Sequence, residues 1–288
     1  MLQVARLAPK LLGESADLVR GFLLSQLNAD GGFRDRDGAS DLYYTVFGME
    51  GLVALRADLP AAQIAAYLRG FGDGASLDFV HLACLARCWA GLPAALRGEV
   101  PADGILSRIE RCRTADGGYG SEEDSRQGSV YGCFLAVGAY QDLGHDPPRI
   151  ADLIRCVQSF QTADGGYANL HGMAEGLTPT TAAAAALLRY YQQPTPAELS
   201  EWLLARAAPG GGFFATPAAP IPDLLSTATA LHALAGLHAD IAAIQEPCLD
   251  FIDSLWTSKG AFHGNWSDDA VDCEYTYYAL LALGHLSL

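Results

Sequence analysis

Four acidic side chains stand where polar loops give way to long apolar segments, a place from which a carboxyl group can do acid chemistry. They are Asp41, Asp223, Asp272 and Glu274. Beside an apolar pocket, such a group can donate a proton or stabilise a developing cation. The free amide groups at the start of a helix also favour anions, so the same positions could surround a phosphate. Capping of a helix is the alternative role for each aspartate.

Tyrosine is frequent in the apolar segments that these acids precede. Aromatic faces attract cations, so tyrosine rings near the carboxyl groups could line a binding site. Packing in a helical core is the alternative, although a buried tyrosine hydroxyl usually needs a polar partner or water. The residues are Tyr43, Tyr44, Tyr131, Tyr190, Tyr191, Tyr275, Tyr277 and Tyr278.

Two groups of residues are of types that bind metal ions. One is the run 272–274 (Asp-Cys-Glu), which could meet His263 or Asp223. Neighbouring residues on a helix point about 100° apart, so at most part of this set converges. The other group shares one helical face and comprises His81, Cys84 and Cys88. A buried helix explains that spacing as simply, and we expect no metal site at either place.

Composition excludes several classes of partner. The chain has 288 residues, with 18 Lys and Arg against 33 Asp and Glu, so its formal net charge is −15. This acidity argues against nucleic acid and against a basic patch for anionic lipid. The seven cysteines, an odd number without a CxxC pair, indicate a reducing compartment. Without a signal-peptide pattern or an apolar run of about 18 residues, we expect a cytoplasmic protein with no membrane span.

A Gly-Gly-aromatic loop returns along the chain and fixes its organisation. The copies are NADGGFRD from Asn28, TADGGYGS from Thr114, TADGGYAN from Thr162, PGGGFFAT from Pro209 and the looser SKGAFHGN from Ser258. Their period of about 46 to 49 residues is typical of helical-pair repeats. A degenerate copy at 71–88 fills the double gap after the first loop, which makes six units.

Each unit predicts two helices of different character. Amphipathic helices are expected near 14–27, 60–70, 101–113, 148–161, 196–207 and 241–256, several with a proline at the first turn. Almost wholly apolar helices, which must be buried on both sides, are expected near 41–55, 76–91, 127–142, 178–192, 222–238 and 270–286.

Six such pairs can form an open solenoid or two concentric rings. A solenoid needs a polar capping face at its ends, but the last helix is apolar up to the final residue. Closure against the first repeat would cover it. We therefore predict an all-α toroid, a single domain over 1–288, with the segment 2–12 as a cap and with the starts of the inner helices around one mouth of a central cavity.

The repeat of Gly-Gly-Phe/Tyr, polar gap and apolar helix resembles the β subunits of protein prenyltransferases, above all that of Rab geranylgeranyltransferase, and the wider group of squalene and terpene cyclases. The resemblance covers essentially the whole chain and is specific for fold. It implies an isoprenyl diphosphate in an aromatic-lined centre, one zinc ion, and a separate helical α subunit as partner.

The zinc ligands that the resemblance implies are replaced at two of three positions. In the Asp-x-Cys step, Asp223 matches but Leu225 stands for cysteine, and in the Asp-x-x-His-Thr step Tyr275 stands for histidine. The basic pair that precedes the zinc aspartate falls in 215–222, which has no Lys or Arg. Arg126, in the place of a histidine of the third repeat, is the remaining candidate for a phosphate contact. The Asp-x-Asp-Asp string of cyclases is also absent.

We therefore expect a divergent transferase or cyclase that binds an isoprenoid without the family's zinc. Asp41, Asp223, Asp272 and Glu274 would be acids or cation stabilisers. Substrate contacts would come from Tyr43, Tyr44, Arg126, Tyr131, Tyr275 and Tyr277. The alternative is an isoprenoid-binding or protein-interaction scaffold without catalysis, because fold analogy alone supports the isoprenoid.

Overall fold

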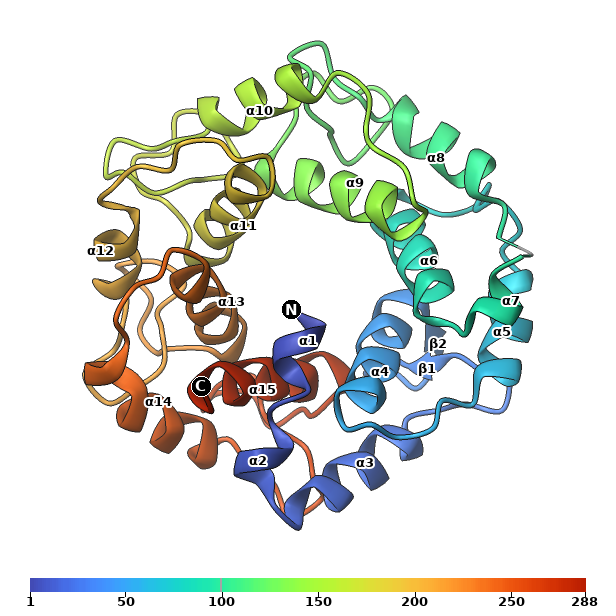
Figure 1. Cartoon of the computed structure of the whole chain (residues 1–288), viewed down its shortest axis with the longest axis horizontal. Coiled ribbons are helices and arrows are strands. Elements are labelled where there is room, and N and C mark those ends of the chain that lie inside the picture. The colour runs from blue at the N-terminus through green and yellow to red at the C-terminus, as the bar shows by residue number, and fades with distance from the viewer. Residues whose placement is uncertain (99) are drawn as a thin grey trace.

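Six apolar helices form an inner ring in the computed structural model, which describes residues 1–98 and 100–288 (Figure 1). They are α4 (Leu42–Ala54), α6 (Phe79–Gly91), α9 (Val130–Asp142), α11 (Thr178–Tyr190), α13 (Leu224–Gly236) and α15 (Cys273–Leu286). Each packs against the next, and α15 packs against α4. The ring therefore closes, and the predicted α/α toroid is confirmed over the open solenoid.

An outer ring of amphipathic helices covers the inner one (Figure 1). It consists of α3 (Ser15–Ser25), α5 (Ala61–Arg69), α8 (Ala102–Arg111), α10 (Ile150–Ser159), α12 (Leu199–Leu204) and α14 (Ala242–Ser254), with the short α7 (Ala94–Arg97) before α8. Pro60 and Pro101 directly precede α5 and α8 as expected. Pro247 differs, because it lies inside α14.

The glycine loops join outer to inner helices and lock neighbouring repeats together. The first glycine of each pair has a left-handed backbone, as at Gly211 with φ 92°. A Cβ at Gly211 would lie 1.8 Å from the carbonyl oxygen of Pro247, so only glycine lets the loop touch the next outer helix. The aromatic residue that follows is buried, and the N–H of Phe213 donates to the Thr227 hydroxyl at 2.9 Å.

The same device closes the outer ring between the last repeat and the first. A Cβ at Gly260 would lie 2.3 Å from the carbonyl oxygen of Leu18 in α3. In the first repeat, β1 (Phe33–Arg34) and β2 (Ser40–Asp41) pair antiparallel and bring the loop directly to the start of α4.

The amino-terminal segment lies over one end of the ring, as the sequence predicted. Its helices are α1 (Leu2–Ala5) and α2 (Pro9–Leu12), and α1 packs on α15 and α4 (Figure 1). Gly284 makes this contact close, because a Cβ there would lie 2.2 Å from the Val4 carbonyl oxygen. The segment thus covers the end of the ring where the inner helices finish. No helix within the described residues is long and apolar enough to cross a bilayer.

Candidate active site in the ring

One stripe of each inner helix faces the ring axis. On α4, Tyr43, Phe47 and Glu50 follow one another at helical spacing and stay partly exposed, whereas their neighbours are mostly buried. Glu274 and Tyr278 hold the same position on α15. On α11 the partly exposed residues are Ala183 and Ala186. We call the space between these stripes the lumen, its end at the starts of the inner helices the mouth, and its opposite end the floor.

Glu274 is the lumen-facing acid at the mouth, whereas Glu50 lies toward the floor and pairs with Arg87. The Tyr43 hydroxyl donates a hydrogen bond of 2.6 Å to Glu274 Oε1. Burial raises the pKa of Glu274 to about 7, with Asp272 adding to the rise and Tyr43 and Arg36 opposing it. Near neutral pH the side chain is therefore divided between acid and carboxylate, which is the state that a general acid needs.

Aromatic rings from two helices surround this acid. Tyr43 meets Phe47 edge-on at 4.9 Å between ring centroids, and Phe47 lies 5.4 Å from Tyr278. Tyr131 on α9 is 43% exposed and lies within electrostatic range of Glu274. The α15–α4 side of the lumen is thus lined by ring faces that can stabilise a cation.

Tyr277 occupies a different place from the one expected of a substrate contact. Its side chain is 1% exposed and packs between α15 and α4, with its ring 5.8 Å from that of Phe47. Tyr278, one position further along α15, takes the lumen-facing place instead. Helical phase explains the difference, because positions i and i+4 from Glu274 share a face and i+3 falls beside it.

Arg36 joins the first repeat to the last at the mouth. Its Nε donates to Asp272 Oδ2 at 2.9 Å and its Nη1 to Asp268 Oδ2 at 3.0 Å. Its guanidinium lies over the Tyr275 ring at 5.4 Å. Asp272 also accepts the N–H of Tyr275 as the N-cap of α15, so it serves both as cap and as ion-pair partner.

His81 bridges two carboxylates on the adjacent side of the mouth. Its Nε2 lies 3.0 Å from Asp41 Oδ2 and its Nδ1 lies 2.9 Å from Asp78 Oδ1. Burial acts to lower the pKa of His81, but the hydrogen bonds to Asp78 and Asp41 outweigh it and raise the pKa. Asp41 also caps α4 through the N–H groups of Tyr43 and Tyr44. Burial raises the pKa of Tyr44 to about 12.

The remaining predicted residues lie apart from this arc. Asp223 caps α13 and binds both the N–H and the hydroxyl of Ser226, each at 2.7 Å. Arg126 is exposed in the loop before α9. The structure therefore brings together Asp41, Asp272, Glu274 and the tyrosines of α4 and α15. Asp223 lies further round the mouth, within electrostatic range of Tyr275.

Sequence reasoning missed the roles of Arg36 and His81. Arg36 is 236 positions from Asp272 in sequence, and only ring closure places them together. The available signal was the first-repeat loop itself, which sits against the last repeat once the ring is closed. His81 stood in the sequence within a group of possible metal ligands, but its ring turns to the carboxylates while Cys84 and Cys88 are buried.

The donor set for zinc is incomplete at the positions that the resemblance implied. Leu225 has no donor atom, the Asp223 carboxylate is engaged by Ser226, and Tyr275 lies beneath Arg36. Over residues 1–98 and 100–288, no three His, Cys, Asp or Glu side chains are arranged to hold a metal ion. These residues do not fit the tetrahedral zinc site of a prenyltransferase.

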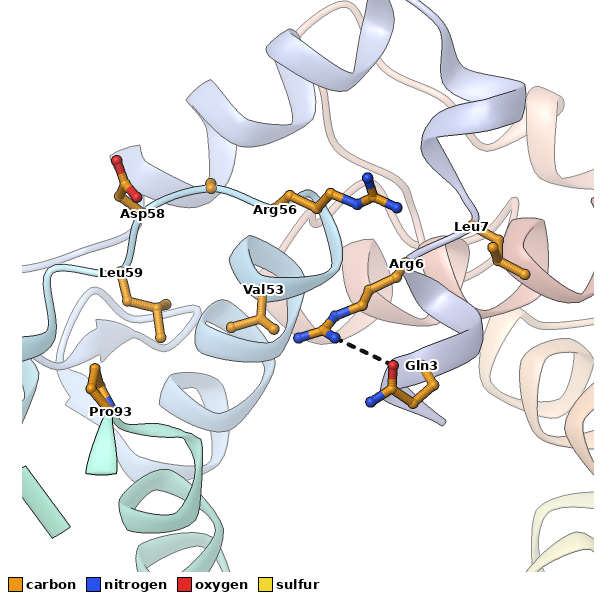
Figure 2. Close-up of a pocket in the computed structure, with 9 residues that line it drawn as sticks. Gln3, Arg6, Leu7, Val53, Arg56, Asp58, Leu59 and Pro93 are labelled. Carbon is orange, nitrogen blue, oxygen red and sulfur yellow. Dashed lines mark hydrogen bonds between the residues drawn. The ribbon is translucent and has the colours of Figure 1, made fainter. Parts of the chain in front are cut away.

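A further pocket of about 760 Å³ lies outside the lumen, on the floor side (Figure 2). It is bordered by the amino-terminal segment and the chain after α4, with Arg6 and Arg56 among its residues. Arg6 donates to the Gln3 side chain at 3.3 Å. Arg56 has a left-handed backbone, but Gln192 and His238 share it at equivalent helix ends, so the conformation belongs to the repeat.

Comparison with known families agrees with this architecture. The model of the prenyltransferase alpha-alpha toroid domain matches residues 9–85, 63–213 and 191–287. The chain therefore belongs to the prenyltransferase alpha-alpha toroid domain family. No curated protein sequence matches it significantly.

Solved structures with the same fold include a terpene cyclase and a protein geranylgeranyltransferase. The type II terpene cyclase MstE from Scytonema in complex with its substrate geranylgeranyl dihydroxybenzoate has 15% identity and a TM-score of 0.63 over 97% of each chain. Candida albicans protein geranylgeranyltransferase-I complexed with GGPP has 16% identity and a TM-score of 0.53 over 97% of this chain and 80% of that one. A protein from Actinoplanes has 16% identity and a TM-score of 0.65 over 95% and 98%. At these identities the likeness concerns the fold.

Proposed function

We propose that this protein binds an isoprenoid along the lumen and converts it by acid-initiated cyclisation, with Glu274 as the proton donor. The observation that carries the proposal is a lumen-facing carboxyl group whose pKa is raised by burial to about 7, hydrogen-bonded to Tyr43 and bordered by aromatic rings. The comparisons support the isoprenoid, because MstE and the geranylgeranyltransferase hold prenyl compounds in the same fold.

The reaction would begin at the chain end of the isoprenoid. The π electrons of a terminal double bond take the proton from Glu274, the O–H bond breaks, and the cation forms on the more substituted carbon. A second double bond then attacks this carbon and forms the ring, and a proton lost to water ends the sequence. Tyr43 stabilises the carboxylate left behind, and the rings of Phe47 and Tyr278 stabilise the cation.

Zinc-dependent prenyl transfer is the competing reaction and would need a metal and a helical α-subunit-like partner. The proposed cyclisation needs neither, because the acid and the aromatic wall come from this chain alone. Replacement of the family ligands at Leu225 and Tyr275 supports the metal-free reaction.

Incubation in D₂O with geranylgeraniol and with geranylgeranyl diphosphate tests the proposal. A proton-initiated reaction places one deuterium from solvent at the protonated carbon, whereas ionisation of a diphosphate places none there and releases pyrophosphate. We expect deuterated cyclic product from the wild type, read by mass spectrometry. We expect Glu274→Gln to reduce its rate at least about 100-fold, the usual contribution of a general acid.

The matched control is Glu246→Gln, the same change on the exposed face of α14. It should leave the rate unchanged. Pyrophosphate release without deuterium, together with bound zinc, would establish prenyl transfer instead. Tight binding of both compounds with no turnover would favour the non-catalytic binder.

A further inference from the structure

The mouth is poorly suited to an anionic head group. Carboxylates dominate it, and they are Asp41, Asp78, Asp223, Asp268, Asp272 and Glu274. Its bases are engaged by these acids, since Arg36 binds Asp268 and Asp272, and His81 binds Asp41 and Asp78. A diphosphate or carboxylate placed here would face like charges in a partly buried setting, which disfavours it.

Two arginines lie at the floor, Arg87 and Arg189, and in the described part of the chain only Arg87 is held in ion pairs. Arg87 there is paired, with Nε 2.6 Å from Glu50 and Nη1 3.5 Å from Asp142. Arg189, at the end of α11, forms no ion pair with any of the described residues. It packs on α13 at Gly236, where a Cβ would lie 2.8 Å from its Cζ. Because Gly236 has no side chain, the Arg189 guanidinium can pack against the backbone of α13. It has no acidic partner there among the residues that the structure describes.

A neutral histidine, His232, lies beside this guanidinium and is paired with a second, His285. His232 borders the same narrow crevice between α11 and α13, and its Nδ1 lies 3.0 Å from Nε2 of His285. Burial lowers the pKa of both, to about 3 for His232 and about 4 for His285, so neither carries charge at neutral pH. His285 is 4% exposed, and its buried Nδ1 has no hydrogen-bond partner within the described chain. An unsatisfied buried polar atom points to a missing polar partner.

The amino-terminal segment covers the floor over α15 and α4, while Arg189 on α11 stays exposed and within reach of a ligand. The segment with α1 lies across this end, and Met1 is within electrostatic range of Glu50, Arg87 and Arg189. A guanidinium forms charge-assisted, often bidentate hydrogen bonds with a carboxylate or a phosphate, so an accessible and unpaired Arg189 suits either group.

The wall between floor and mouth on this side is made of methyl groups. α11 presents Ala183 and Ala186 where α4 presents Phe47 and Glu50. Arg189 is the twelfth residue of α11 and Glu274 the second of α15, so they are separated along the axis by about 15 Å at 1.5 Å per residue. This separation is the axial span that the extended apolar chain of a ligand would cover.

We propose that the lumen binds an isoprenoid acid or phosphate head-down, with the anionic group on Arg189 at the floor and the chain end at Glu274 at the mouth. This inference rests on the proposed function and names its substrate class. It assigns Arg189 as the head-group contact, Gly236 as its seat, and the His232–His285 pair as neutral donors beside it.

The test measures binding to the full chain by calorimetry. Geranylgeranoic acid, geranylgeranyl phosphate and the neutral geranylgeraniol share one chain and differ in head group. We expect the wild type to prefer the two anions, and Arg189→Gln to weaken them by about tenfold or more while changing geranylgeraniol less than about twofold. Gly236→Ala should act in the same direction, because it displaces the guanidinium without removing its charge.

Arg56, outside the lumen, serves as the matched control, and Arg126 tests the alternative phosphate contact. Arg56→Gln, in the outer pocket of Figure 2, should change no affinity. Loss of anion binding in Arg56→Gln or Arg126→Gln, but not in Arg189→Gln, would overturn the head-down orientation. If Arg189→Gln weakens binding of geranylgeranyl phosphate alone, the natural ligand is a phosphate. If it weakens binding of geranylgeranoic acid alone, the natural ligand is a carboxylic acid. If the wild type binds none of the three compounds, the proposed function itself fails.

Discussion

At the scale of single residues, the environment of Glu274 separates it from the other acids of the mouth. Asp41, Asp223 and Asp272 accept backbone N–H groups as helix caps, as the sequence allowed. Glu274, the second residue of α15, is not the cap and accepts a hydrogen bond from the Tyr43 hydroxyl. The sequence predicts that all four acids lie at helix starts, but it does not predict which of them is the proton donor. Burial and the contact with Tyr43 on another helix determine the pKa of Glu274.

The raised pKa of Glu274 should appear in the pH dependence of stability. The unfolded side chain ionises near its ordinary value of 4.5, whereas the folded one holds its proton to about 7. Stability is therefore lost as the pH rises through this window. We expect Glu274→Gln to raise the free energy of unfolding at pH 8 by roughly 1–3 kcal/mol and to leave it nearly unchanged at pH 4. Urea melts at both pH values measure this, and an equal effect at both would contradict it.

Tyr43 should set the pH limit of turnover. Its hydroxyl stabilises the carboxylate form of Glu274, so removing it favours the protonated acid. We expect wild-type turnover to fall as the pH rises through about 7, and the Tyr43→Phe profile to fall at higher pH. Rates of product formation between pH 5 and pH 9, a range of about two units on each side, give both curves. If the two pH profiles coincide, Tyr43 does not influence the pKa of Glu274.

At the scale of elements, the sequence predicted the helices well because two periodicities coincide. The apolar runs mark the inner helices, and the Gly-Gly-aromatic loops mark their starts about every 48 residues. The sequence does not predict which stripe of each inner helix faces the lumen. The inner helices are apolar nearly all round, so the sequence does not distinguish Tyr277 from Tyr278. Both rings contact Phe47, but Tyr277 is buried and Tyr278 stays partly exposed.

Gly284 offers a test of how α1 is held. A Cβ there meets the Val4 backbone, which cannot rotate away as a side chain can. We expect Gly284→Ala to lower the free energy of unfolding by roughly 1–3 kcal/mol and to increase amide exchange in residues 2–8. Gly138→Ala is the control, since a Cβ at Gly138 meets nothing within 4 Å in the middle of α9. It should be neutral or stabilising, and matching effects of the two changes would argue against the packing explanation.

At the scale of the whole molecule, one contact type repeated around the ring makes closure possible. Gly260 touches Leu18 as Gly211 touches Pro247, so the last joint is built like an internal one. Closure was predictable from the apolar last helix, whereas its consequence for chemistry was not. It brings Arg36 to Asp272 and Tyr43 to Glu274, pairs more than 230 positions apart.

The net charge of −15 should make the stability of the ring depend on salt. Excess carboxylates repel one another in the compact state, and ions screen this over about 10 Å at 0.1 M. We expect the melting temperature to rise by several degrees between about 0.01 M and 0.5 M sodium chloride. Differential scanning calorimetry measures the shift, and a melting temperature that falls with salt would show that paired charges such as Arg36–Asp272 outweigh the repulsion.

The run of alanines in α11 has a consequence for how this protein could change. Ala183 and Ala186 present only methyl groups to the lumen, and Ala186 also borders the crevice that holds Arg189. Replacing either alanine by a larger apolar residue would narrow the lumen at that level. The size of the side chains at these two positions would therefore limit the size of the ligand, so a single substitution could select a smaller ligand while the reacting groups stay in place.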